Sequence, residues 1–154
     1  MAVTKAHKIP QVMLFTDGAC LGNPGPGGWA ALLRFGKKEK LLVGKNPDTT
    51  NNQMEMKAVI EGLKALKKAC EITVFTDSRY VMDGYNQWLP GWKAKNWRNS
   101  KKEPVKNKSL WQELDEQAAR HKISWQWVKG HSGHPENERV DQAARDAAET
   151  LRSH

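Results

Sequence analysis

Cysteine is scarce in this sequence, which limits how the fold can be cross-linked. The 154 residues include two cysteines, Cys20 and Cys70, and neither belongs to a Cys-x-x-Cys pair. Two cysteines are too few for a disulfide framework, so the class of small, disulfide-rich secreted domains is excluded. We therefore expect both to be reduced thiols.

Long hydrophobic runs are absent as well. Residues 1–10 contain no apolar stretch of signal-peptide length, and no part of the chain approaches the length of a membrane span. This pattern predicts a cytoplasmic protein with no membrane partner. A chain of 154 residues suits one domain, 1–154, large enough to bury a core, and we expect residues 1–10 to be a flexible N-terminal extension.

Acidic residues are outnumbered, and the excess of positive charge is concentrated in one stretch. The net charge is +8 at pH 7. Within residues 88–108, which we name the basic segment, seven lysine and arginine side chains accompany a single glutamate, and Trp88, Trp92 and Trp97 are interspersed. Cationic stems beside aromatic faces are typical of a surface that binds a polyanion. The alternative is a solvated charged face whose tryptophans pack between short helices, and we expect both.

Two short stretches nearly repeat each other, and each places an aspartate after an apolar run. Residues 11–16 and 72–76 are rich in β-branched and aromatic residues, and they are followed by Asp17 and Asp77. Each run is predicted to be a strand that ends at its aspartate. Matching strand ends of an open α/β sheet lie together, so the two carboxylates are expected to converge. The commoner alternative is that each aspartate only opens a turn or caps a helix.

A third carboxylate, Glu55, lies near the start of a predicted helix that follows polar capping residues and runs to about Ala69. Glu55 is four residues before Val59, at the edge of the apolar stripe, and is therefore expected to face inward. The helix dipole alone would explain an acid in this first turn, but not its inward direction. The stripe consists of Met56, Val59, Ile60, Leu63 and Leu66.

The last part of the chain supplies two further candidates, Asp141 and His131. Pro135 marks the start of a final helix, and Asp141 neighbours its apolar stripe, although by itself it is a typical surface charge. His131 lies in the glycine-containing loop before this helix. A loop histidine is usually a solvated bystander, but beside a carboxylate cluster it is suited to proton transfer.

Several motifs, in one order and spacing, carry a resemblance to a known family. They read TDGACLGNPGPGGWA, TTNNQMEMKAVIEGL, FTDSRYV and WVKGHSGHPENERVDQAA. They closely resemble bacterial ribonuclease HI, of the type 1 ribonuclease H family, over roughly residues 11–151. The resemblance implies a sequence-nonspecific endonuclease that hydrolyses the RNA strand of RNA/DNA hybrids and leaves 5′-phosphate and 3′-hydroxyl ends.

The carboxylate set favours hard divalent cations, Mg²⁺ first and Mn²⁺ as a substitute, with zinc a poorer candidate. The resemblance implies two ions during catalysis. Asp17 would bridge both, Glu55 and Asp77 would complete the ligands of one, and Asp141 would belong to the other. His131 would assist proton transfer or product departure.

The resemblance also implies a substrate-binding set. Contacts to the RNA strand are implied for Cys20, Asn23, Asn51, Asn52 and Arg79, and contacts to the DNA strand for Thr50, Trp88 and Asn107. The basic segment corresponds to the family's handle, and the set is completed by Trp92, Lys93, Lys95, Arg98, Lys101, Lys102 and Lys129. Asparagines at strand and helix ends are also routine turn and cap residues. One departure is Asp48, where some relatives carry an arginine.

The predicted fold class is mixed α/β (α+β). Strands at 11–16, 29–35 and 41–44 are expected to form an antiparallel meander, and a helix from Asn51 leads to a parallel fourth strand. The resemblance implies a ribonuclease H-like, five-stranded mixed sheet flanked by helices, with the basic segment protruding. Residues 22–28 lack the Lys-Ser/Thr ending of a P-loop and are interpreted as a tight strand connection.

Two other functions stay open at this point. A non-catalytic hybrid-binding module would keep the basic segment but normally lose one of the acids. A nuclease of the same fold that acts on DNA junctions would keep the acids without the hybrid-specific asparagines. No obligate protein partner is inferred, and a monomer is the default expectation.

Overall fold

Five strands form one mixed sheet in the order β3-β2-β1-β4-β5. The computed structural model describes residues 9–129 and 134–152. The first three strands pair antiparallel, whereas β4 and β5 run parallel to β1, which confirms the predicted sheet. The strands are β1 (Gln11–Cys20), β2 (Gly25–Phe35), β3 (Lys38–Thr49), β4 (Glu71–Thr76) and β5 (Lys122–Trp127).

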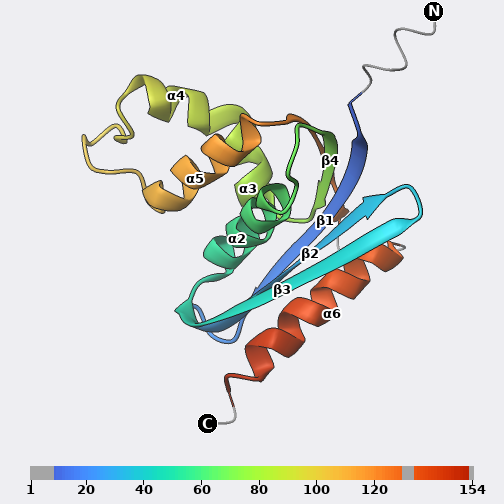
Figure 1. Cartoon of the computed structure of the whole chain (residues 1–154). Helices are drawn as coiled ribbons and strands as arrows, with labels where there is room; N and C mark the ends of the chain where they lie inside the picture. The colour runs from blue at the N-terminus through green and yellow to red at the C-terminus, as the bar shows by residue number, and fades with distance from the viewer. Residues whose placement is uncertain (1–8, 130–133, 153–154) are drawn as a thin grey trace, which may run out of the picture.

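Helices cover both faces of this sheet (Figure 1). Alternation along β1 sends Leu14 into the core beneath α2 and α5, and Phe15 into a smaller core beneath α6. Within the basic segment, α4 and the loop after it extend away from the sheet. The helical elements are α2 (Asn51–Lys64), α3 (Arg79–Asp83), the π-helix η1 (Gly84–Trp88), α4 (Leu89–Ala94), α5 (Lys108–Ala118) and α6 (Pro135–Glu149).

The first strand is longer than predicted, and this moves Asp17 from a strand end to a strand interior. Residues 18–20 continue the antiparallel ladder with β2, and Asp17 itself pairs with Ala30. The predicted connection at 22–28 shrinks accordingly, because β2 already begins at Gly25. Pairing between strands thus overrides the local turn preference of the glycines. The second aspartate, Asp77, does follow directly after the end of β4.

The long helix α2 ends at Lys64 rather than near Ala69. The Arg120 guanidinium donates to the carbonyl oxygen of Leu63 in the last turn of the helix and to that of Leu66, two residues beyond the helix end. A side chain distant in sequence therefore holds the chain where it leaves α2. The predicted stripe is buried as expected up to Leu63, whereas Leu66 packs on the core from beyond the helix end.

At the N-terminus, most of the predicted extension 1–10 lies outside the described residues. The carbonyl oxygen of Pro10 accepts a hydrogen bond from the backbone N–H of Glu71 at 2.8 Å, so the chain is attached to β4 from this point. Across the described ranges, no helix combines the length and apolarity that a membrane crossing requires. Cys20 and Cys70 are both free thiols.

Candidate active site

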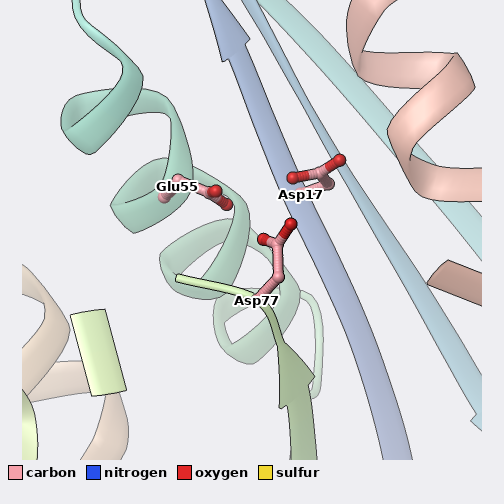
Figure 2. Close-up of side chains that lie close together, drawn as sticks. All are labelled: Asp17, Glu55 and Asp77. Atoms are coloured by element: carbon pink, nitrogen blue, oxygen red, sulfur yellow. The ribbon is translucent and has the colours of Figure 1, made fainter. Parts of the chain in front are cut away.

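Three carboxylates from distant parts of the sequence meet at the carboxyl end of β4. Asp17 comes from the interior of β1, Glu55 from the second turn of α2, and Asp77 from the residue after β4. One oxygen atom of each lies within 4.8 Å of the oxygens of the other two. Figure 2 shows the three side chains directed toward one another. The structure therefore brings together three of the predicted residues.

A glycine beside Asp17 permits this convergence. A Cβ atom on Gly18 would lie 2.4 Å from the backbone nitrogen of Glu55, so a larger residue cannot be accommodated without moving β1 from α2. The backbone N–H of Gly18 also donates to Oδ1 of Asp17 at 2.9 Å. Gly18 thus sets the approach of the helix to the strand and fixes one carboxylate oxygen.

The electrostatics of the cluster are unfavourable for three bare carboxylates. Burial, a hydrogen bond with Asp141 and the charges of Asp77 and Asp141 raise the pKa of Asp17 to about 9. Burial, followed by the charges of Asp17 and Asp77, raises the pKa of Glu55 well above its usual value. Such groups require either protons or cations to balance them.

Oxygen atoms without hydrogen-bond partners indicate that the site is suited to cations. Among the described residues, Oδ2 of Asp17 and Oε1 of Glu55 are buried and have no hydrogen-bond partner. Buried acceptor atoms without donors are costly in a native protein. An all-oxygen set with vacant acceptor positions is the ligand chemistry that Mg²⁺ and Mn²⁺ prefer, so the residues fit divalent cations.

The fourth predicted carboxylate approaches from the opposite face of the sheet. Asp141 lies on α6, and its hydrogen bond with Asp17 contributes to the raised pKa of Asp17. Its Oδ2 pairs with Nη2 of Arg145 at 2.6 Å. His131, the predicted proton carrier, lies outside the described residues, and the nearby Lys129 is exposed.

Four of the five residues expected to contact the RNA strand lie around the start of α2, whereas Arg79 lies at the start of α3. Oδ1 of Asn23 accepts a hydrogen bond from the backbone N–H of Asn51 at 3.1 Å, and Asn51 and Asn52 are exposed. The Cys20 thiol donates to the carbonyl oxygen of Thr49 at 3.2 Å. Asn23 therefore has the local capping role considered as its alternative, while it lies beside an exposed asparagine pair.

Two of the residues expected to contact the DNA strand, Thr50 and Asn107, are linked by hydrogen bonds through Gln53. Thr50 caps α2 through its hydroxyl, which accepts from the backbone N–H of Gln53. The Gln53 amide donates to Oδ1 of Asn107 at 3.1 Å, and the Asn107 amide donates to the Tyr80 hydroxyl at 3.1 Å. The start of α2 is thus linked to the end of the basic segment.

The basic segment combines the packed tryptophans and the exposed cations that the sequence predicts. Trp92 packs against the buried Trp111 with ring centroids 5.3 Å apart, whereas Trp88 is 41% exposed. The predicted cationic contacts of this segment are all exposed, and they are Lys93, Lys95, Arg98, Lys101 and Lys102. The tryptophans mostly build the element, and the cations remain at its surface.

Sequence reasoning missed three residues at this site. Gln53 and Tyr80 hold Asn107, and Trp127 stacks on Arg79. Trp127 ends β5, and the register of β5 against β4 places it beside Thr76, the residue before Asp77. This register is a tertiary property that a local sequence pattern does not show.

The sheet order and the acidic cluster define a protein of the ribonuclease H-like class. The RNase H family model matches residues 10–149. A ribonuclease H from Hydrogenovibrio crunogenus is 61% identical over 143 residues, which span 93% of this chain and 99% of the relative. The chain therefore belongs to the ribonuclease H family and is an enzyme of that family.

Solved structures agree with this assignment. LC9-RNase H1, described as a type 1 RNase H with the type 2 active-site motif, has a TM-score of 0.84 and 31% sequence identity, and the match covers 93% of this chain and 74% of that chain. LC11-RNase H1, solved in complex with an RNA/DNA hybrid, has a TM-score of 0.64 and 22% sequence identity, and the match covers 92% of this chain and 99% of that chain.

 RNase H1 from the halophilic archaeon Halobacterium salinarum NRC-1 has a TM-score of 0.62 and 25% sequence identity, and the match covers 91% of this chain and 98% of that chain. At 22% identity, the likeness to LC11-RNase H1 shows the fold alone.

Proposed function

We propose that this chain is an endonuclease that hydrolyses the RNA strand of RNA/DNA hybrids, without sequence preference, at the four-carboxylate site. The observation that carries the proposal is the convergence of Asp17, Glu55 and Asp77 within 4.8 Å, with Asp141 hydrogen-bonded to Asp17. Membership of the ribonuclease H family supports the same reaction. The products are 5′-phosphate and 3′-hydroxyl ends.

In the proposed site, Asp17 is central because it lies beside both the Glu55–Asp77 pair and Asp141. It would therefore contribute to two cation positions, one completed by Glu55 and Asp77 and the other by Asp141. Two bound divalent cations, Mg²⁺ or Mn²⁺, supply an activated water and stabilise the leaving oxygen at phosphorus. The Gly18 N–H holds Asp17 Oδ1 in place, and His131 is proposed to carry a proton.

The proposed substrate surface has two parts, one for each strand. Small polar groups near the start of α2 suit the 2′-hydroxyls of an RNA strand across a wide minor groove. This part consists of Cys20, Asn23, Asn51 and Asn52, together with Arg79 at the start of α3. The DNA-strand part consists of Thr50, Trp88 and Asn107. The basic segment and Lys129 would contact phosphates along the duplex. A fold neighbour, LC11-RNase H1, was solved with an RNA/DNA hybrid.

The test compares cleavage of an RNA/DNA hybrid, double-stranded RNA and double-stranded DNA of one sequence, with Mg²⁺ or with a chelator. We expect cleavage of the RNA strand of the hybrid only, abolished by chelator. Asp17→Asn protein, purified identically, controls for contaminating nuclease. Tight hybrid binding without cleavage would indicate a binding module, and cleavage of DNA junctions alone would indicate the related nuclease. A cytoplasmic location and a monomeric state stay predictions.

A further inference from the structure

An exposed aromatic side chain lies beside the strand end that carries Asp77, and the proposed reaction gives it no role. Trp127 is the last residue of β5, and it pairs in register with Thr76, the residue before Asp77. It is 43% exposed and lies on β5, the strand at one edge of the sheet. Its position therefore raises the question of what the ring contacts.

The ring contacts a cation. The guanidinium carbon of Arg79 lies 4.9 Å from the centroid of the Trp127 ring, within the range of a cation–π interaction. Arg79 begins α3, directly after the capping residue Ser78, so it is two residues beyond Asp77. The cluster carboxylate, the arginine and the tryptophan thus occupy neighbouring positions at the ends of two parallel strands.

A second contact restrains the same guanidinium. Nε of Arg79 donates to Oδ2 of Asp83 at 3.2 Å, one turn further along α3. The Trp127 ring therefore lies against the guanidinium and the Asp83 carboxylate accepts from Nε, so neither of these two contacts uses the terminal nitrogens Nη1 and Nη2. A long arginine side chain that is 55% exposed would otherwise lose considerable conformational freedom when it bound a ligand.

We propose that Trp127 is a positioning residue that preorganises Arg79 to donate hydrogen bonds to a backbone oxygen of the RNA strand beside the carboxylate cluster. The proposal deepens the proposed function and rests on it, because Arg79 is assigned there to the RNA strand. Trp127 acts through Arg79 and not on the reacting atoms. Its contribution is to binding, so it belongs in KM rather than in kcat.

The test is a double-mutant cycle on hybrid cleavage with Trp127→Leu, Arg79→Ala and the double variant. We expect Trp127→Leu to raise KM about two- to fivefold with kcat nearly unchanged, since an exposed cation–π contact is worth that factor. Trp127→Phe keeps an aromatic face and is expected to recover part of the loss. In the Arg79→Ala background, Trp127→Leu is expected to have no further effect. Phe35→Leu, an exposed aromatic at the opposite end of the sheet, serves as the matched control.

The acceptor is either a 2′-hydroxyl or a phosphate oxygen, and salt dependence separates the two. Loss of a phosphate contact reduces the slope of log Kd against log salt by about 1, whereas loss of a 2′-hydroxyl contact leaves it unchanged. Equal KM increases for Trp127→Leu with and without Arg79 would overturn the proposal. So would a fall in kcat at constant KM. If the wild-type protein does not cleave hybrid, the proposed function fails, and the same cycle measured as hybrid Kd still tests the coupling.

Discussion

Individual acidic side chains in the cluster oppose folding when no cation is present. Asp17 is 3% exposed, and its pKa rises from its usual 3.8 to about 9 through burial first and then through Asp141 and Asp77. At pH values between 3.8 and about 9, the folded chain binds more protons at Asp17 than the unfolded chain does. The stabilisation associated with this proton is complete below pH 3.8 and is lost as the pH rises toward about 9. The metal-free protein is therefore expected to lose stability with rising pH in this window.

Replacing Asp17 with asparagine tests this conflict directly. In chelator at pH 7, Asp17→Asn is expected to raise the free energy of unfolding by about 1–3 kcal/mol, because folding at pH 7 must protonate Asp17 against its usual pKa of 3.8, whereas asparagine is neutral in both states. Mg²⁺ is expected to stabilise the wild-type protein more than the variant, since the cation binds the folded carboxylates. Urea unfolding with and without Mg²⁺ measures both effects. Lower stability of the metal-free variant than of the wild type would contradict the electrostatic account.

Between elements, the close approach of β1 and α2 depends on Gly18. We expect Gly18→Ala to lower the free energy of unfolding by about 1–3 kcal/mol, because the added Cβ would lie 2.4 Å from the backbone nitrogen of Glu55. It should also weaken cation binding by displacing Glu55 from Asp17. Thermal unfolding and Mn²⁺ titration measure the two effects. Gly91→Ala in α4 is the matched control, since no atom lies within 4 Å of its added Cβ. Equal stabilities of the two variants would refute the role given to Gly18.

The elements also show how far sequence patterns lead. The near-repeated strands predicted that Asp17 and Asp77 converge, and the apolar stripe predicted that Glu55 faces inward, because local periodicity determines which way such side chains point. The family resemblance implied that the three belong to one ligand set. The position of Asp17 inside β1 was not predictable in this way, since it depends on the ladder with β2. Likewise, the hydrogen bond from Arg120 to the last turn of α2 joins residues distant in sequence, and the contact of Trp127 with Arg79 depends on the β4–β5 register.

Across the whole molecule, the net positive charge is concentrated in the basic segment, where seven lysine and arginine side chains accompany one glutamate. We expect the double variant Lys101→Ala, Lys102→Ala to weaken hybrid binding and to reduce the slope of log Kd against log salt by about 1–2, because fewer counterions are released. Fluorescence anisotropy over a salt series measures this. Lys37→Ala, Lys38→Ala in the β2–β3 turn region removes the same charge from exposed positions and is the control. Equal slopes for the two double variants would contradict a localised binding surface.

The most direct test of the carboxylate site is the rate of hybrid cleavage in Mg²⁺ for four single variants, Asp17→Asn, Glu55→Gln, Asp77→Asn and Asp141→Asn. Each is expected to cleave at least about a hundredfold more slowly than the wild type, because the proposed site would lose a ligand for the divalent cations that would activate water and stabilise the leaving oxygen. Asp146→Asn, an exposed acid on α6, is the control and should retain the wild-type rate. Wild-type cleavage by the Asp17, Glu55 or Asp77 variants would contradict the assignment of the cluster as the catalytic centre.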